Sequence, residues 1–278
     1  MIKDLLVHLD GSEADERRLA FAEPIARKSD AFLTGLLVNE IPEVMVAGDP
    51  SLSAAQVVID LQNEAIETGN KTKAALETRM ERLSVNNELR RIDVYVSRAG
   101  AHIATEARVS DLFVALRPYG HPQDNMAAAF EAVLFDSGRP TLFVPPEGPP
   151  PENYDTILVA WQDTREAARA ISDAMPFLTA AKSVIVALVD EGGPAEQQGV
   201  EPGADVARHL DRHGVNVEVR HVEGWSRTSD AILNEAGKSG ADMIVMGGYG
   251  HSRFREWILG GTTREILSAA GVPVLVTH

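Results

Sequence analysis

The chain has 278 residues, a formal net charge of −15 and no cysteine. The length favours two domains, and the lack of cysteine excludes disulfide frameworks, thiolate metal sites and thiol nucleophiles. The acidic excess disfavours general nucleic-acid binding, because it repels a polyanion over long range. No apolar run reaches the roughly 18–20 residues of a membrane span, and the N-terminus lacks a signal-peptide pattern. We therefore expect a cytoplasmic protein that contacts neither membrane nor nucleic acid.

Short apolar runs alternate with longer amphipathic stretches from the N-terminus onward. Residues 5–9 and 32–38 predict strands, and 14–29 predict a helix whose apolar side chains recur every three or four positions. A longer helix is expected over 54–83. This β–α–β order is typical of a parallel sheet covered by helices.

The pattern starts again at Thr156, after a proline-rich stretch. Trp161 lies 152 positions after Leu9, and other landmarks of the two halves keep the same offset. A constant offset indicates a duplicated domain. In the second half the predicted strands are 156–161, 183–189, 215–222, 242–247 and 273–277.

We therefore expect an α/β protein of two tandem Rossmann-like domains. Each is predicted to be an open, five-stranded, mostly parallel sheet of order 3-2-1-4-5 flanked by helices. The predicted boundaries are 1–146 for the first domain, 147–153 for a semi-rigid linker and 154–278 for the second domain. The longer middle helix belongs to the first domain.

A glycine-rich loop follows the fourth predicted strand of the second half, at the edge where such sheets bind ligands. Gly247 and Gly250 allow backbone N–H groups to approach a ligand closely. Gly260, Gly261 and Thr262 open the last helix, with one of its threonines as a candidate N-cap, and a helix N-terminus attracts anions. The loop favours a di- or triphosphate, although tight turns alone also call for glycine. It is neither a P-loop nor the dinucleotide fingerprint.

The spacing Gly247-x2-Gly250-x9-Gly260 resembles the nucleotide loop of the universal stress protein family. Residues 5–12 and 271–276 are similar to that family's first and last strands. The resemblance implies a cytoplasmic, stress-associated protein of Rossmann-like fold. Many members of the family bind ATP, whereas others have lost the loop and do not.

The resemblance also implies which residues would hold the nucleotide. It assigns phosphate contacts to the glycine loop and the start of the last helix, the base to the end of the second strand, and the ribose or base to the end of the first. The residues so implied are Gly247, Gly250, Gly260, Gly261, Thr262, Val189 and Gln162. Mg²⁺ is a candidate companion of the nucleotide, but no carboxylate is evidently placed for it.

Both halves depart from the family's motif. Gln162 stands where the family has an aspartate, and Gly261 where it has serine or threonine. In the first half Asp10 matches the family, but Leu116 and Tyr119 replace two loop glycines, and neighbouring prolines remove N–H donors. We expect the first half not to bind ATP in the family's way.

Other candidate sites have weaker patterns. His209 and His213 have metal-ligand spacing but no HExxH motif around them. Arg253 and Arg255 are candidates for phosphate contacts or for surface ion pairs. Asp10 is expected to orient a ribose or to cap the following helix. No motif of a serine nucleophile is present.

The predicted function is that of a stress-associated regulatory protein that binds ATP through its second domain, with no catalytic residue identified. The alternatives are a protein-interaction module that binds no nucleotide, a slow ATPase, and a binder of another anionic ligand in the first half. The resemblance implies that the last strands, 141–145 and 274–277, pair antiparallel within one chain as a pseudo-dimer. A further homodimer and an unidentified protein partner remain open.

Overall fold

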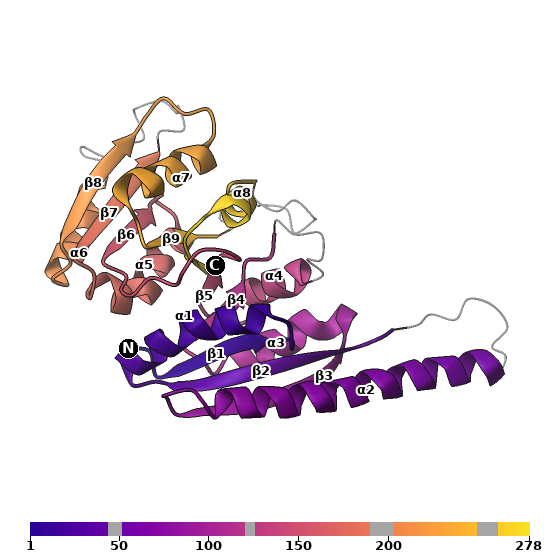
Figure 1. Cartoon of the computed structure of the whole chain (residues 1–278). Helices are drawn as coiled ribbons and strands as arrows, with labels where there is room; N and C mark the ends of the chain where they lie inside the picture. The colour runs from indigo at the N-terminus through magenta and orange to yellow at the C-terminus, as the bar shows by residue number, and fades with distance from the viewer. Residues whose placement is uncertain (44–51, 120–125, 190–202, 249–260) are drawn as a thin grey trace. The chain divides into compact units, whose positions relative to one another are not determined.

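The computed structural model describes residues 1–43, 52–119, 126–189, 203–248 and 261–278. They form two compact units, drawn in Figure 1. Unit 1 is Met1–Ala115 with Met126–Ser137, and unit 2 is Leu116–Asn125 with Gly138–His278. The fifth strand of the first repeat and the segment after its fourth strand thus belong to unit 2. The domain boundaries drawn from the sequence repeat stay predictions.

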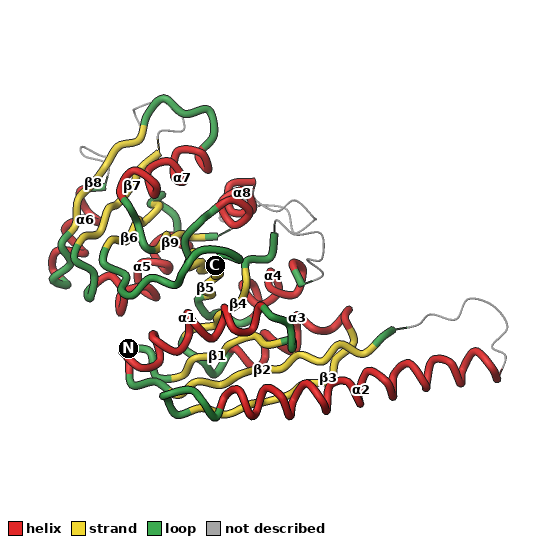
Figure 2. The backbone as a smooth tube through the Cα atoms, viewed as in Figure 1, coloured by secondary structure: helices red, strands yellow, loops and turns green. Residues whose placement is uncertain are grey.

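Unit 1 is a parallel sheet with helices on its faces (Figure 2). Its elements are β1 (Asp4–Leu9), α1 (Ala14–Ser29), β2 (Phe32–Ile41), α2 (Leu52–Met80), β3 (Asn87–Tyr95), a 3-10 turn (Val96–Arg98), α3 (Ala99–Ala107), β4 (Leu112–Leu116) and α4 (Ala127–Asp136). The strand order is β3-β2-β1-β4, and Val7 of β1 lies beside Gly35 of β2 and Val114 of β4. The apolar runs of β1 and β4 are buried, as expected of strands covered on both faces.

Unit 2 repeats this arrangement. Its elements are β5 (Thr141–Val144), β6 (Thr156–Ala160), α5 (Arg165–Leu178), β7 (Ser183–Val189), α6 (Ala204–Arg212), β8 (Val217–Val222), α7 (Thr228–Ser239), β9 (Met243–Gly247), α8 (Gly261–Ala269) and β10 (Val274–Thr277). The parallel order is β8-β7-β6-β9-β10, and β5 pairs antiparallel with β10, with Leu142 beside Leu275.

The predicted architecture is confirmed. In the second half the strands have the expected order 3-2-1-4-5, and in the first half the first four stand in the order 3-2-1-4. The last strands of the two halves pair antiparallel within one chain, which is the expected pseudo-dimer contact. The long helix predicted over 54–83 spans Leu52–Met80.

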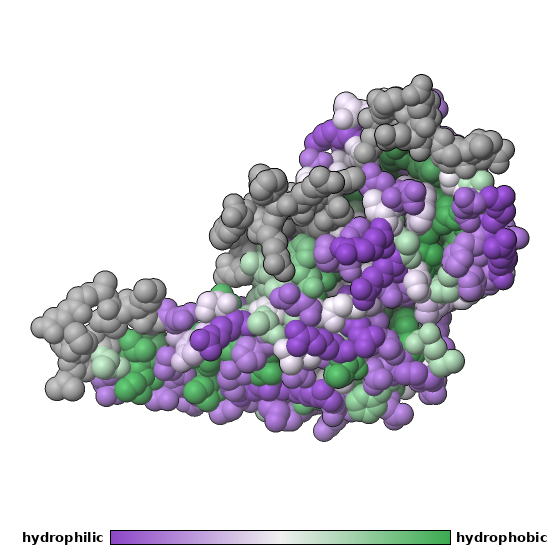
Figure 3. Space-filling model, turned by 180° about the vertical axis from the view of Figure 1, so that it is seen from behind, coloured by the Kyte–Doolittle hydropathy of each residue, from purple (hydrophilic) through white to green (hydrophobic). Residues whose placement is uncertain are grey.

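Hydrophilic residues cover most of the face drawn in Figure 3, in keeping with the net charge of −15. Helix α2 nevertheless exposes four large apolar side chains: Val57, Ile59, Leu61 and Ile66. Among the described residues, no helix combines the length and the apolar content that a bilayer span requires.

Candidate functional site

Parallel strands bring the predicted ligand residues of unit 2 to one edge of its sheet. Val189 ends β7 and lies beside Val222, the last residue of β8. Gly247 ends β9, and the exposed Gln162 follows β6 by two residues. The structure therefore gathers Gln162, Val189 and Gly247 at the carboxyl ends of neighbouring strands, where doubly wound sheets bind ligands.

Gly247 is required by packing. A Cβ at this position would lie 2.6 Å from the backbone nitrogen of Ala167 and 2.6 Å from the carbonyl carbon of Glu166. The end of β9 therefore touches the first turn of α5 so closely that no side chain fits between them. The sequence contained no signal for this contact, because it depends on how α5 docks on the sheet.

The next residue, Gly248, already has partners within the chain. Its N–H donates to the carbonyl oxygen of Thr277 at 2.8 Å. Its carbonyl oxygen lies 3.1 Å from Nδ1 of His278. The amide of Gly248 is therefore not available to a ligand.

Groups in the first turn of α5 also have partners within the chain. The hydroxyl oxygen of Thr164 accepts a hydrogen bond from the N–H of Ala167 at 3.3 Å, which caps the helix. Glu166 is buried, and its carboxylate accepts from Nε of Arg165 at 2.8 Å. Burial raises the pKa of Glu166, but hydrogen bonds from its own N–H and from Arg165 outweigh burial and hold that pKa below its ordinary value. This corner therefore holds a buried carboxylate that is ion-paired with the exposed Arg165.

The first turn of α8 has room beside it. The helix begins at Gly261, and a Cβ there would meet no atom of the described residues within 4 Å. The N–H groups of a helix's first turn have no partner inside the helix, so they can bind an anion. The prediction that Thr262 or Thr263 is the N-cap is wrong, because both lie inside the first turn and Thr263 is buried.

Several predicted residues lie outside the described part of the chain. They are Gly250, Gly260, Arg253 and Arg255. Their roles stay predictions, and the described part of the candidate site consists of Gln162, Val189, Gly247, Gly261 and Thr262.

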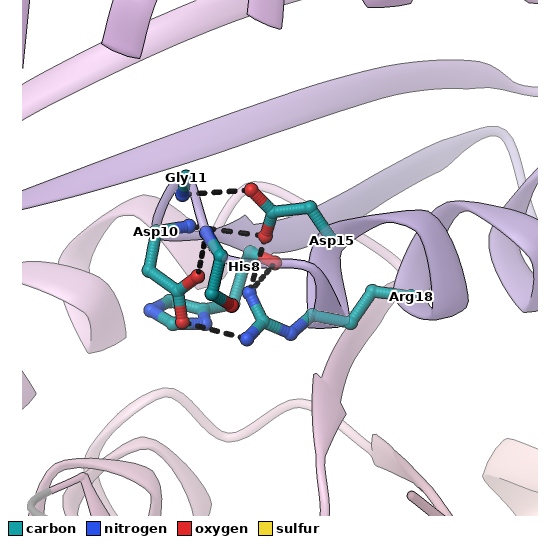
Figure 4. Close-up of polar contacts among 6 residues, drawn as sticks. His8, Asp10, Gly11, Asp15 and Arg18 are labelled. Atoms are coloured by element: carbon teal, nitrogen blue, oxygen red, sulfur yellow. Dashed lines mark hydrogen bonds and ion pairs between the residues drawn. The ribbon is translucent and has the colours of Figure 1, made fainter. Parts of the chain in front are cut away.

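The corresponding corner of unit 1 is filled by an arginine (Figure 4). Arg18 reaches back from α1 to the end of β1, where Nη2 contacts Asp10 Oδ2 at 2.6 Å and Nη1 contacts Asp15 Oδ1 at 2.6 Å. Nη1 also donates to the carbonyl oxygen of His8 at 3.1 Å. The Asp15 carboxylate accepts from the N–H of Asp10 at 3.1 Å and of Gly11 at 2.7 Å. Arg18 and Asp15 are 3% and 4% exposed, whereas the Asp10 side chain, 35% exposed, lies at the rim of the cluster.

Two carboxylates share this one guanidinium. Burial raises the pKa of Asp10, but the charge and hydrogen bond of Arg18 outweigh burial and hold that pKa well below its ordinary value. Burial raises the pKa of Asp15 to about 6, against the attraction of Arg18 and assisted by the negative charge of Asp10. The cluster is therefore neutral only when Asp15 holds a proton.

Asp10 does not cap α1, which corrects one of the two expected roles. Its Oδ1 accepts from the N–H of Ser12 at 2.9 Å, and α1 begins after Glu13 without a side-chain cap. Its other oxygen, Oδ2, contacts Arg18, so both carboxylate oxygens of Asp10 have partners within the chain. The expectation that the first half does not bind ATP in the family's way stays a prediction.

The second half lacks this arginine cluster. The positions 152 residues after His8, Asp10, Asp15 and Arg18 are Ala160, Gln162, Ala167 and Ala170. Arg18 was not among the predicted site residues, although the sequence carried a signal for it. It is an arginine on the apolar side of the predicted helix 14–29, and the equivalent position of the second half is alanine.

His8 lies beside this cluster and is buried. Its ring contacts Phe130 edge-on, with 5.1 Å between ring centroids. Among the described residues its Nδ1 has no hydrogen-bond partner. Burial, followed by the charge of Arg18, lowers the pKa of His8 from 6.5 to about 3.

Unit 1 is expected to lose roughly 2 kcal/mol of stability through His8 between pH 7 and pH 5. The unfolded imidazole binds a proton below pH 6.5 while the buried ring stays neutral to about pH 3, so stability present above 6.5 is lost as the pH falls. Asp15, with its raised pKa of about 6, acts in the opposite direction. Hydrogen exchange of the β1 amides therefore measures the change in stability between pH 7 and pH 5 in wild type and in His8→Leu. The difference between these two changes is the contribution of His8. His221→Leu, at an exposed position in β8, should keep the wild-type pH dependence.

The histidine pair on α6 gains no support as a metal site. The rings of His209 and His213 are in contact, with centroids 4.8 Å apart. In the described ranges no group of three or more histidine, aspartate or glutamate side chains is arranged to hold a metal ion.

The fold is that of a doubly wound α/β protein, and the candidate ligand site lies in its second half. Residues 153–278 match the model of the universal stress protein family. By this match, the second half of the chain is a universal stress protein domain. It is 33% identical over 66 residues to a universal stress protein of Synechocystis, a match that covers 24% of this chain and only 22% of that protein.

Solved structures support the fold over the whole length. A universal stress protein from Archaeoglobus fulgidus superposes with a TM-score of 0.74 at 20% identity, covering 99% of this chain and 95% of that chain. A functionally unknown protein from Pseudomonas aeruginosa superposes with a TM-score of 0.56 at 18% identity, covering 99% of this chain and 92% of that one. At these identities the likeness concerns the fold alone.

Proposed function

We propose that the second half binds an adenine nucleotide, ATP, and that the protein acts as a stress-associated regulator in the cytoplasm. The observation that carries this proposal is the first turn of α8, where no atom of the described residues fills the space beside Gly261. This turn follows the glycine loop whose spacing is that of the family's nucleotide motif. Among the described residues, the Gly248 amide and the Ala167 N–H of α5 already have partners, which favours the first turn of α8 as a place for phosphate.

The remaining predicted contacts fit the same edge. Val189, half-buried at the end of β7, offers an apolar surface to the base, and Gln162 offers an uncharged hydrogen-bonding group to the ribose or base. No carboxylate cluster suited to Mg²⁺ exists among the described residues, so any Mg²⁺ is expected to be bound through the phosphates of the nucleotide. No general base is identified, and we propose binding rather than turnover.

Gly261→Asp is expected to weaken ATP binding at least about tenfold while leaving the fold intact. The positive end of the helix dipole stabilises a carboxylate in the first turn, but this carboxylate repels a phosphate bound beside the turn. The control is Gly271→Asp, which adds the same charge beyond the other end of α8, at a position that is also open. Isothermal titration with ATP and ADP, together with thermal unfolding, measures both effects. Equal weakening by the two substitutions would point to general charge repulsion and contradict the proposed site.

The second candidate function is a protein-interaction module that binds no nucleotide. Gln162 stands where the family has an aspartate, and this favours the second candidate, because the uncharged side chain cannot supply a carboxylate to the ribose. Absence of binding heat at millimolar ATP and ADP in the wild type would contradict nucleotide binding and favour this alternative.

A further inference from the structure

Helix α8 is held in place by a segment of the first repeat. Arg117, directly after β4, donates from Nη1 to the carbonyl oxygen of Ala270 at 3.0 Å, just past the C-terminal end of α8. Its own N–H donates to the carbonyl oxygen of Val144 in β5 at 3.0 Å. A cation at a helix C-terminus satisfies a carbonyl that has no partner in the helix and complements the helix dipole.

Tyr119, two residues further along, contacts the middle of the same helix. The Arg264 guanidinium lies over its ring, 5.2 Å from the ring centroid. Tyr119 is 7% exposed, so the contact is shielded from water, where a cation–π interaction is stronger than at the surface. Leu116–Tyr119 belongs to unit 2 together with α8, so these contacts lie within one compact unit.

A third contact comes from the start of α7. Glu265 of α8 accepts a hydrogen bond from the buried hydroxyl of Ser229 and lies 3.8 Å from Nη1 of Arg227. Helix α8 has nine residues and begins with glycine. A helix this short is unstable in isolation, so its first turn is ordered only as far as tertiary contacts hold it.

We propose that Leu116–Tyr119, the segment that took the place of the glycine loop in the first half, is a brace that fixes α8 and thereby sets the nucleotide affinity of the second half. The segment lost the phosphate-binding glycines and gained Arg117 and Tyr119, both of which hold the helix that opens at Gly261. Tyr119 is then a positioning residue, which acts through Arg264 and touches no ligand. The link to affinity rests on the proposed function, whereas the brace itself does not.

The test compares Tyr119→Ala and Tyr119→Phe with wild type in the full-length protein. Hydrogen exchange of the α8 amides is expected to quicken about three- to thirtyfold in Tyr119→Ala and to stay near wild type in Tyr119→Phe, which keeps the ring face. ATP affinity should fall about threefold or more in the alanine variant and recover in the phenylalanine variant. The control is Tyr154→Ala, which removes a ring that contacts Phe177 of α5.

Each outcome bears on one part of the proposal. Wild-type exchange of α8 in Tyr119→Ala, or equal quickening by Tyr154→Ala, would overturn the brace. Faster exchange with unchanged ATP affinity would keep the brace and overturn its link to binding. If wild type binds no ATP, the proposed function fails, while the exchange measurement still decides whether Tyr119 fixes α8.

Discussion

Replacing Arg18 by methionine is expected to destabilise unit 1 by about 3–5 kcal/mol. Methionine keeps much of the apolar stem but removes the guanidinium that Asp10 and Asp15 share at 2.6 Å each. Removal of one partner from a buried ionic cluster leaves the other charges without compensation, and this penalty exceeds the loss of the contact itself.

Hydrogen exchange of β1 is the suitable measurement for this variant. All three tryptophans, at 161, 225 and 257, belong to unit 2, so tryptophan fluorescence does not report on unit 1. The matched control is Arg208→Met in α6, where the arginine is exposed and pairs with Asp205, and where the loss should stay below about 1 kcal/mol. Adding Asp15→Asn to Arg18→Met should recover part of the loss, because the amide oxygen still accepts hydrogen bonds but carries no charge. A loss below about 1 kcal/mol in Arg18→Met would contradict the cluster's structural role.

Gly247→Ala is expected to destabilise unit 2 by about 2–3 kcal/mol. The added methyl would lie 2.6 Å from backbone atoms of α5, which cannot rotate away as a flexible side chain can. Urea unfolding followed by tryptophan fluorescence reports this unit. The matched control is Gly261→Ala, which has open space and should leave stability equal or slightly raised, because alanine favours a helix more than glycine does. Wild-type stability of Gly247→Ala would mean that α5 moves aside without cost.

The strands and their order were predictable because buried parallel strands are short, apolar and evenly separated by amphipathic helices. The repeat offset also indicated that 141–145 and 274–277 are equivalent strands, and they do pair with each other. The start of α8 was misjudged by one or two residues, because two glycines and two threonines in a row all suit a helix N-terminus.

The contacts at the candidate site were less predictable, because they depend on side chains from different elements. The composition around Gly247 suggested a phosphate loop, but its tight fit against Ala167 is visible only once α5 is docked. The ion pair of Arg18 with Asp10 joins residues eight positions apart across a strand end and a helix, a spacing that no motif records. The contact between Tyr119 and Arg264 joins positions from the two repeats, which the repeat pattern alone does not relate.

The β5–β10 pairing also affects how the chain can fold during synthesis. Thr141 of β5 is made 133 residues before the equivalent Val274 of β10, the strand with which β5 pairs. At about 5–20 residues per second, β5 waits roughly ten seconds on the ribosome before its partner strand emerges. During that time its apolar edge can pair with a neighbouring nascent chain. Unit 2 therefore stays incomplete until β10 has emerged, and its folding should depend more on chaperones than that of unit 1.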